Sequence, residues 1–140
     1  MTDTMTTTLV VVGTDGSGEA AKAVEWAADY VRRTGGTLEI VTTWSWPMTY
    51  GAPTGIPNYS PDVDAHDVAD KAVAEAGLPH DRIRTTVVNG QAAQVLCQRS
   101  ADADLLIVGS RGHGGFAGML LGSVSNYCVH HAGCPVVVIR

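Results

Sequence analysis

The chain of 140 residues has few lysines, few cysteines and no long apolar run. Its only lysines are Lys22 and Lys71, whereas a P-loop NTPase needs a lysine directly after the last glycine of its phosphate-binding loop, so that class is excluded. The 3 cysteines show no CxxC spacing, and we expect neither a disulfide nor a metal site from them. No apolar run approaches the roughly 20 residues that span a bilayer, and residues 1–8 lack the basic and apolar regions of a signal peptide. We therefore expect a cytoplasmic protein.

The charge balance is acidic, with 9 basic against 14 acidic residues and a net charge of −5. This is the wrong sign for a protein that binds nucleic acid through a broad basic face. An anionic ligand would need a local site. The length and the 45% hydrophobic content predict a single globular domain over residues 1–140.

Short apolar blocks alternate along the chain with segments of helical periodicity. Strands are predicted at 9–12, 37–44, 83–88, 105–108 and 135–139, and helices at 18–33, 61–76, 91–100 and 122–131. Ser17 is placed to cap the first helix, and Gly35 and Gly36 to end it. Strict alternation predicts an α/β fold, a five-stranded parallel sheet with helices on both faces.

The segment 45–61 has no sustained period and contains four prolines, two glycines and three aromatic residues. Loops of this length are uncommon inside compact domains and are often functional, so the segment is a candidate lid. An insertion without a role is an equal alternative.

Two loops that follow predicted strands have unusual sequences, residues 13–17 and residues 109–123. In an open parallel sheet, ligands bind beyond the carboxyl ends of the strands where the strand order reverses, and the first and fourth strands would be neighbours there. The second loop has six glycines and leads into the helix at 122–131. Glycine lets backbone N–H groups approach a phosphate, and a helix N-terminus adds free donors and partial positive charge. The pattern predicts an anion-binding loop.

Four side chains at this loop could bind an anion. Ser123 and Ser125 offer hydroxyl donors, and Arg111 and His113 offer positive charge. Ser123 could instead serve only as the helix cap.

Other chemistry fits the sequence less well. A dinucleotide fingerprint matches at Gly112-x-Gly114-x-x-Ala117, but it does not directly follow the strand, and no acidic residue occurs after Asp104 to hold a ribose. No Gly-x-Ser-x-Gly elbow is present, which argues against a hydrolase triad.

The spacing of Gly109, Gly112 and Gly122-Ser123 resembles the glycine motif of the universal stress protein family, ATP-binding type. The resemblance includes residues 11–17, 108–115, 121–125 and 130–138, and so extends over nearly the whole chain. It implies a Rossmann-like, adenine nucleotide alpha hydrolase-like fold. It also implies ATP, AMP or a cyclic nucleotide as ligand, with Mg²⁺ held by the phosphates.

The resemblance assigns a role to each candidate residue. Asp15 would contact adenosine with Thr14 beside it, and Thr43 would form part of the adenine pocket. Gly109 and Gly112 would approach the ribose and phosphates, next to Arg111 and His113, and the phosphate chain would lie against Gly122, Ser123, Val124 and Ser125.

The function expected from these features is that of a nucleotide-binding regulatory protein of the stress response, at most a weak ATPase. No base is poised to activate water, and no lysine is near the phosphates. The alternative is a dimeric interaction protein of the same fold that binds no nucleotide. A homodimer through the strand at 136–139 is expected in either case, because this edge is rich in β-branched residues and related proteins pair through it.

Overall fold

A computed structural model describes residues 8–46, 48–49, 52–53, 60–111 and 121–140. Its main sheet contains the parallel strands β1 (Leu9–Gly13), β2 (Thr37–Trp44), β5 (Ile83–Asn89), β6 (Leu105–Gly109) and β7 (Val136–Ile139), in the order β5-β2-β1-β6-β7. Four helices connect them, α1 (Gly18–Thr34), α2 (Pro61–Ala76), α3 (Ala92–Ser100) and α4 (Ser123–His131). The predicted α/β fold is confirmed.

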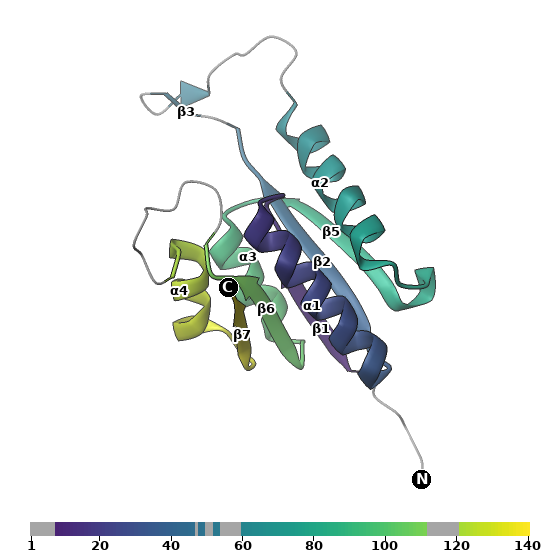
Figure 1. Cartoon of the computed structure of the whole chain (residues 1–140). Helices are drawn as coiled ribbons and strands as arrows, with labels where there is room; N and C mark the ends of the chain where they lie inside the picture. The colour runs from purple at the N-terminus through teal and green to yellow at the C-terminus, as the bar shows by residue number, and fades with distance from the viewer. Residues whose placement is uncertain (1–7, 47, 50–51, 54–59, 112–120) are drawn as a thin grey trace.

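The helices form a layer on each side of the sheet (Figure 1). Helix α1 packs with α2 on one face, and α3 packs with α4 on the other. Strand β1 pairs with β2 on one side and with β6 on the other, so the strand order reverses between β1 and β6. The two loops with unusual sequences therefore follow adjacent strands, as predicted.

Strand β1 lies at the centre of the core, and its valines are completely buried. Val10 and Val12 pack on the α1 side, in a cluster that includes Val24. Val11 points to the other side, where Leu96 of α3 and Cys128 of α4 surround it. Because both faces of the strand are covered, an unbroken apolar run is required here rather than an alternating one.

Helix boundaries follow the predicted signals closely. The Ser17 hydroxyl accepts a hydrogen bond from Ala20 N at 3.2 Å, and α1 ends at Gly35, whose φ is 79°. Helix α4 begins one residue later than predicted, and its N-cap is Gly122, so the alternative that Ser123 caps it is wrong. The backbone of Gly122 is extended, with φ −76° and ψ 172°, which places residue 122 outside the helix, and its N–H donates to Ser110 O at 2.6 Å.

The segment after β2 has more regular structure than predicted. Met48–Thr49 (β3) and Ala52–Pro53 (β4) form a short antiparallel pair. Residues 47, 50–51 and 54–59 lie outside the described residues, and so does most of the candidate lid. A short 3-10 helix, His80–Arg82, precedes β5. Within the described residues, no helix combines the length and apolarity that crossing a membrane requires.

A buried carboxylate in β2 is the main polar feature of the fold. Glu39 is fully buried, and Arg99 of α3 donates a hydrogen bond to it at 2.8 Å. Arg84 and Thr86 of β5 donate two more. Burial alone would raise the pKa of Glu39, but the hydrogen bonds from Arg99 and Thr86 and the charges of both arginines outweigh it and hold the pKa below its usual value. Glu39 thus joins α3 to the β5 edge of the sheet.

Candidate functional site

The loop after β1 is fixed to the neighbouring strand. Thr14 N donates to Val41 O at 3.0 Å, and the hydroxyl of Thr42 donates to Thr14 O at 2.7 Å. These two hydrogen bonds tie the start of the loop to β2. The loop therefore presents its next residues at the carboxyl edge of the sheet in a defined position.

Asp15 is exposed at this edge and also shapes the turn. Its Oδ1 accepts a hydrogen bond from Ser17 N at 2.9 Å, the bond expected of an Asp that stabilises its own turn. Gly16 follows with a φ of 84°, a conformation that favours glycine. The turn role of Asp15 is compatible with ligand binding, and its contact with adenosine stays a prediction.

Ser110, directly after β6, holds the two ends of the glycine-rich loop together. Its carbonyl accepts hydrogen bonds from Gly122 N at 2.6 Å and from the buried hydroxyl of Ser125 at 2.8 Å. Its own N–H donates to Ile139 O of β7 at 2.7 Å. The N-terminus of α4 therefore lies beside the carboxyl end of β6. The first N–H groups of a helix have no partner within the helix, and here they lie at the carboxyl edge of the sheet.

Gly109 has a packing role that the sequence did not reveal. A Cβ atom at this position would lie 3.0 Å from the backbone oxygen of Glu19 in α1. The hydroxyl of Ser110 also donates to Glu19 Oε2 at 3.2 Å. A side chain at residue 109 would thus make a tight contact with α1, so glycine favours the close approach of α1 to the end of β6 whether or not a ribose also binds.

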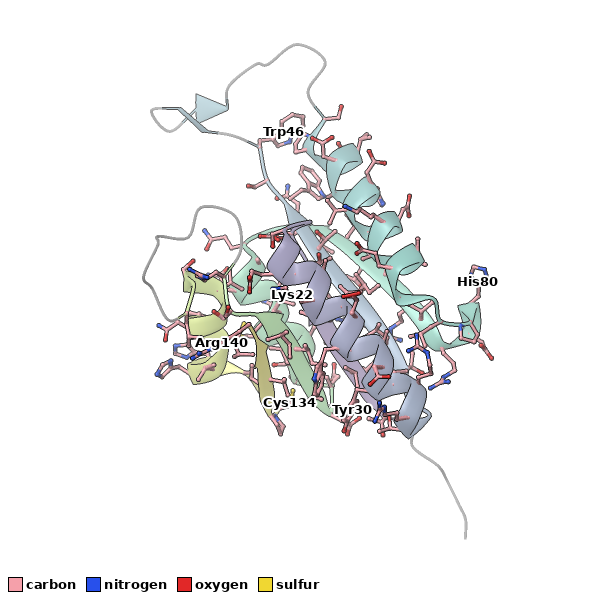
Figure 2. The ribbon with its side chains drawn as sticks, viewed as in Figure 1. Lys22, Tyr30, Trp46, His80, Cys134 and Arg140 are labelled. Atoms are coloured by element: carbon pink, nitrogen blue, oxygen red, sulfur yellow. The ribbon has the colours of Figure 1, made fainter. Side chains whose placement is uncertain are left out.

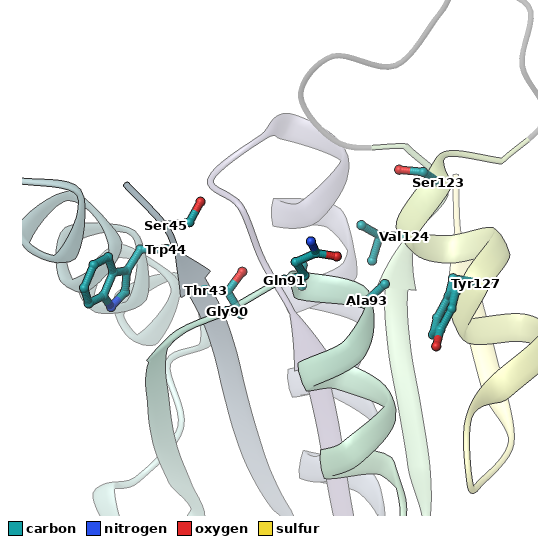
Figure 3. Close-up of a pocket in the computed structure, with 10 residues that line it drawn as sticks. Thr43, Trp44, Ser45, Gly90, Gln91, Ala93, Ser123, Val124 and Tyr127 are labelled. Atoms are coloured by element: carbon teal, nitrogen blue, oxygen red, sulfur yellow. The ribbon is translucent and has the colours of Figure 1, made fainter. Parts of the chain in front are cut away.

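A cavity of about 470 Å³ opens at this edge, within the range of small-molecule sites (Figure 3). It lies between the ends of β2 and β5 and the N-terminal turns of α3 and α4. Its described lining residues are Thr43, Trp44, Ser45, Gly90, Gln91, Ala92, Ala93, Ser123, Val124 and Tyr127. None of these side chains carries a full charge.

Three of the predicted site residues, Thr43, Ser123 and Val124, line this cavity. Six others lie at or next to the same edge of the sheet, but outside the described lining. These are Thr14, Asp15, Gly109, Arg111, Gly122 and Ser125. Gly112 and His113 lie outside the described residues.

Sequence reasoning missed the contribution of the loop between β5 and α3 and that of Tyr127. The available signal was the predicted parallel sheet, because in such a sheet the third strand also ends at this edge. Gly90 N donates to Trp44 O at 3.0 Å, which fixes the missed loop to the end of β2.

The strand order defines an open α/β protein, and a cavity of small-molecule size lies at the carboxyl ends of its strands, near the topological switch point. The model of the universal stress protein family matches residues 7–140. The chain belongs to this family.

Three relatives illustrate the match. Universal stress protein Rv2623 of Mycobacterium tuberculosis is 37% identical over 148 residues, which cover 94% of this chain and 44% of that protein. The crystal structure of a universal stress protein in complex with cAMP is 30% identical, with a TM-score of 0.66 and coverage of 95% of this chain and 96% of the other. The universal stress protein from Archaeoglobus fulgidus in complex with dAMP is 19% identical, with a TM-score of 0.69 and coverage of 95% and 98%, and it supports the fold alone. The chain spans less than half the length of the first curated relatives that it matches.

Proposed function

We propose that this chain binds an adenine nucleotide, with ATP as the first candidate, at the carboxyl edge of its sheet. The observation that carries the proposal is the N-terminus of α4, which Ser110 holds against β6 at the rim of a 470 Å³ cavity. A relative that is 30% identical over most of its length is described in complex with cAMP, which supports the class of ligand.

The phosphates would lie at the first turn of α4. Ser123, Val124 and Ser125 offer backbone N–H groups there, and the helix dipole favours negative charge. The hydroxyl of Ser123 is exposed and available to a phosphate, whereas that of Ser125 already donates to Ser110 O and Gly122 O. Ser125 would therefore act by backbone contact and by holding the loop.

Positive charge at the phosphates would come from Arg111, two residues after the end of β6, and from His113, and Gly112 would approach the phosphates. Mg²⁺ would be held by the phosphates of the nucleotide rather than by a set of protein ligands. On the nucleoside side, Thr43 lines the cavity, and Thr14 and Asp15 present polar groups on the adjacent strand end.

The proposed role is regulatory and cytoplasmic, with slow or absent hydrolysis. Fast phosphoryl transfer needs positioned positive charge and a group that orients water. Lys22 lies on α1 (Figure 2), where its ammonium is 3.8 Å from Glu19 Oε1. Lys71 lies on α2. Neither lysine is on a loop that leads into α4. Bound nucleotide would therefore act by changing conformation or partner surface.

Calorimetric titration of nucleotide-free protein with ATP tests the proposal. Ser123→Asp should lower ATP affinity by more than about tenfold, because it places a carboxylate where phosphate would lie. Asn126→Asp is the matched control, since Asn126 is exposed one turn further along α4 and receives the same charge. If wild-type protein does not bind ATP, the alternative of an interaction protein replaces the proposal.

We also propose that the chain forms a homodimer through β7. This strand is an edge of the sheet, and all four of its residues, Val136–Ile139, are half-buried in the isolated chain. An edge strand of β-branched residues is a template for pairing with another strand. Val138→Lys should shift the protein towards monomer in light scattering, while Thr85→Lys on the opposite edge strand, β5, should not. A wild-type monomer at micromolar concentration would contradict the dimer.

A further inference from the structure

Gln91 occupies the N-cap position of α3 but does not cap the helix. Its backbone is extended, with φ −88° and ψ 130°, and its side chain makes no capping hydrogen bond. N-cap side chains usually satisfy a free N–H group of the first turn. Gly90 N donates to Trp44 O, which fixes the backbone next to Gln91 on the end of β2. The side-chain amide of Gln91 is left available, because it makes no capping bond.

The Gln91 side chain faces the cavity. Figure 3 shows its amide between Thr43 of β2 and Val124 of α4, with Ala93 beside it. Among the described lining residues the polar side chains are otherwise hydroxyls, apart from the indole of Trp44. The ring of Trp44 is directed away from Gln91 in the same view. Gln91 is thus the described lining residue that offers a donor and an acceptor in one planar group.

The small neighbours of Gln91 leave space for a flat ring. Ala93 and Val124 have short apolar side chains, and the described lining contains no ionisable acid or base apart from the phenol of Tyr127. A neutral heterocycle with hydrogen-bonding groups on its rim suits such a site better than a phosphate does. The phosphates would lie next to the base, at the first turn of α4, where Ser123 also lines the cavity.

We infer that Gln91 reads the nucleobase and selects adenine over guanine, an inference that rests on the proposed nucleotide site. Gln91 Oε1 would accept a hydrogen bond from the adenine amino group, and Nε2 would donate to the adjacent ring nitrogen N7. Guanine presents two acceptors on the same edge, O6 and N7, which one amide cannot pair with in this way. Gln91 is therefore a specificity-determining residue.

Parallel titrations with ATP and GTP test the inference on nucleotide-free protein. Gln91→Glu should reduce the ratio of ATP to GTP affinity about tenfold or more. A carboxylate cannot donate to N7 of adenine, whereas guanine can turn its other edge towards residue 91 and donate from N1–H and from its 2-amino group. Gln91→Ala should lower ATP affinity and bring the ratio closer to one. Both variants should fold normally, because the wild-type side chain makes no capping bond.

Gln94→Glu is the matched control, because Gln94 is exposed on the same helix and lies outside the described lining of the cavity. It should leave the ATP to GTP ratio unchanged within about twofold, since it makes no contact with the base. If wild type binds ATP but neither Gln91 variant changes the ratio, the inference is overturned and the nucleotide site stands. If wild type binds neither nucleotide, both are overturned.

Discussion

Two polar regions of this molecule use their hydrogen-bonding groups in opposite ways. Around Glu39, side chains from β2, β5 and α3 are paired with one another, and both carboxylate oxygens have partners. At the carboxyl edge of the sheet, Ser123 is exposed and Gln91 makes no capping bond. The first arrangement stabilises the fold, whereas the second leaves groups available for a ligand. Polarity alone therefore does not distinguish the two regions, and Arg99 Nε in the first is itself buried without a hydrogen-bond partner. What differs is that the groups at the sheet edge are exposed.

The largest expected effect on stability comes from removing the carboxylate of Glu39, which its hydrogen-bond partners surround. Glu39→Ala should lower the free energy of unfolding by about 3 kcal/mol, because it leaves Arg99 and Arg84 without their buried partner. This is near the lower end for a buried ion pair, since the side chains of Arg84 and Arg99 are 54% and 37% exposed and can reach water. Urea denaturation measures the change.

The matched control is Glu25→Ala on the exposed face of α1. It should change the free energy of unfolding by less than about 0.5 kcal/mol, as surface substitutions usually do. Equal losses for the two variants would show that the Glu39 cluster does not stabilise the fold.

A smaller loss of stability is expected from removing the hydrogen bond between the Ser125 hydroxyl and Ser110 O, at the carboxyl edge of the sheet. Ser125→Ala should lower the free energy of unfolding by about 1 kcal/mol, because it removes the buried hydrogen bond to Ser110 O. Ser123→Ala, two residues earlier, should leave it unchanged within about 0.5 kcal/mol. Thermal unfolding followed by circular dichroism compares the two variants, and a larger loss for Ser123→Ala would reverse the comparison.

The smallest expected effect is the pH dependence of the contribution that Glu39 makes to the free energy of unfolding. The pKa of Glu39 is lowered in the folded protein, so its contribution to stability is present above its unfolded pKa of about 4.3 and is lost as the pH falls through the folded pKa. The difference in unfolding free energy between wild type and Glu39→Gln should be constant from pH 6 to 8 and shrink below about pH 4. A difference that grows on acidification would contradict this assignment.

The sequence predicted what depends on neighbouring residues and on the order of elements. Ser17 and Gly35 act as the helix signals indicated, and the alternation of strands and helices predicted the sheet. Glu39 was missed because Arg99, its partner at 2.8 Å, is 60 residues away, and no local pattern pairs them. Gln91 was missed for a similar reason. Its importance depends on the packing of α3 beside α4, which forms the cavity only in three dimensions.

Ser110 connects regions of the molecule that are otherwise separate. Through its N–H it binds Ile139 of β7, through its carbonyl it binds Gly122 and Ser125, and through its hydroxyl it binds Glu19 of α1. The proposed dimer edge and the proposed phosphate site thus share one residue. Thermodynamic linkage then imposes reciprocity on the two equilibria: if nucleotide binding strengthens pairing of two copies by some factor, pairing must strengthen nucleotide binding by the same factor.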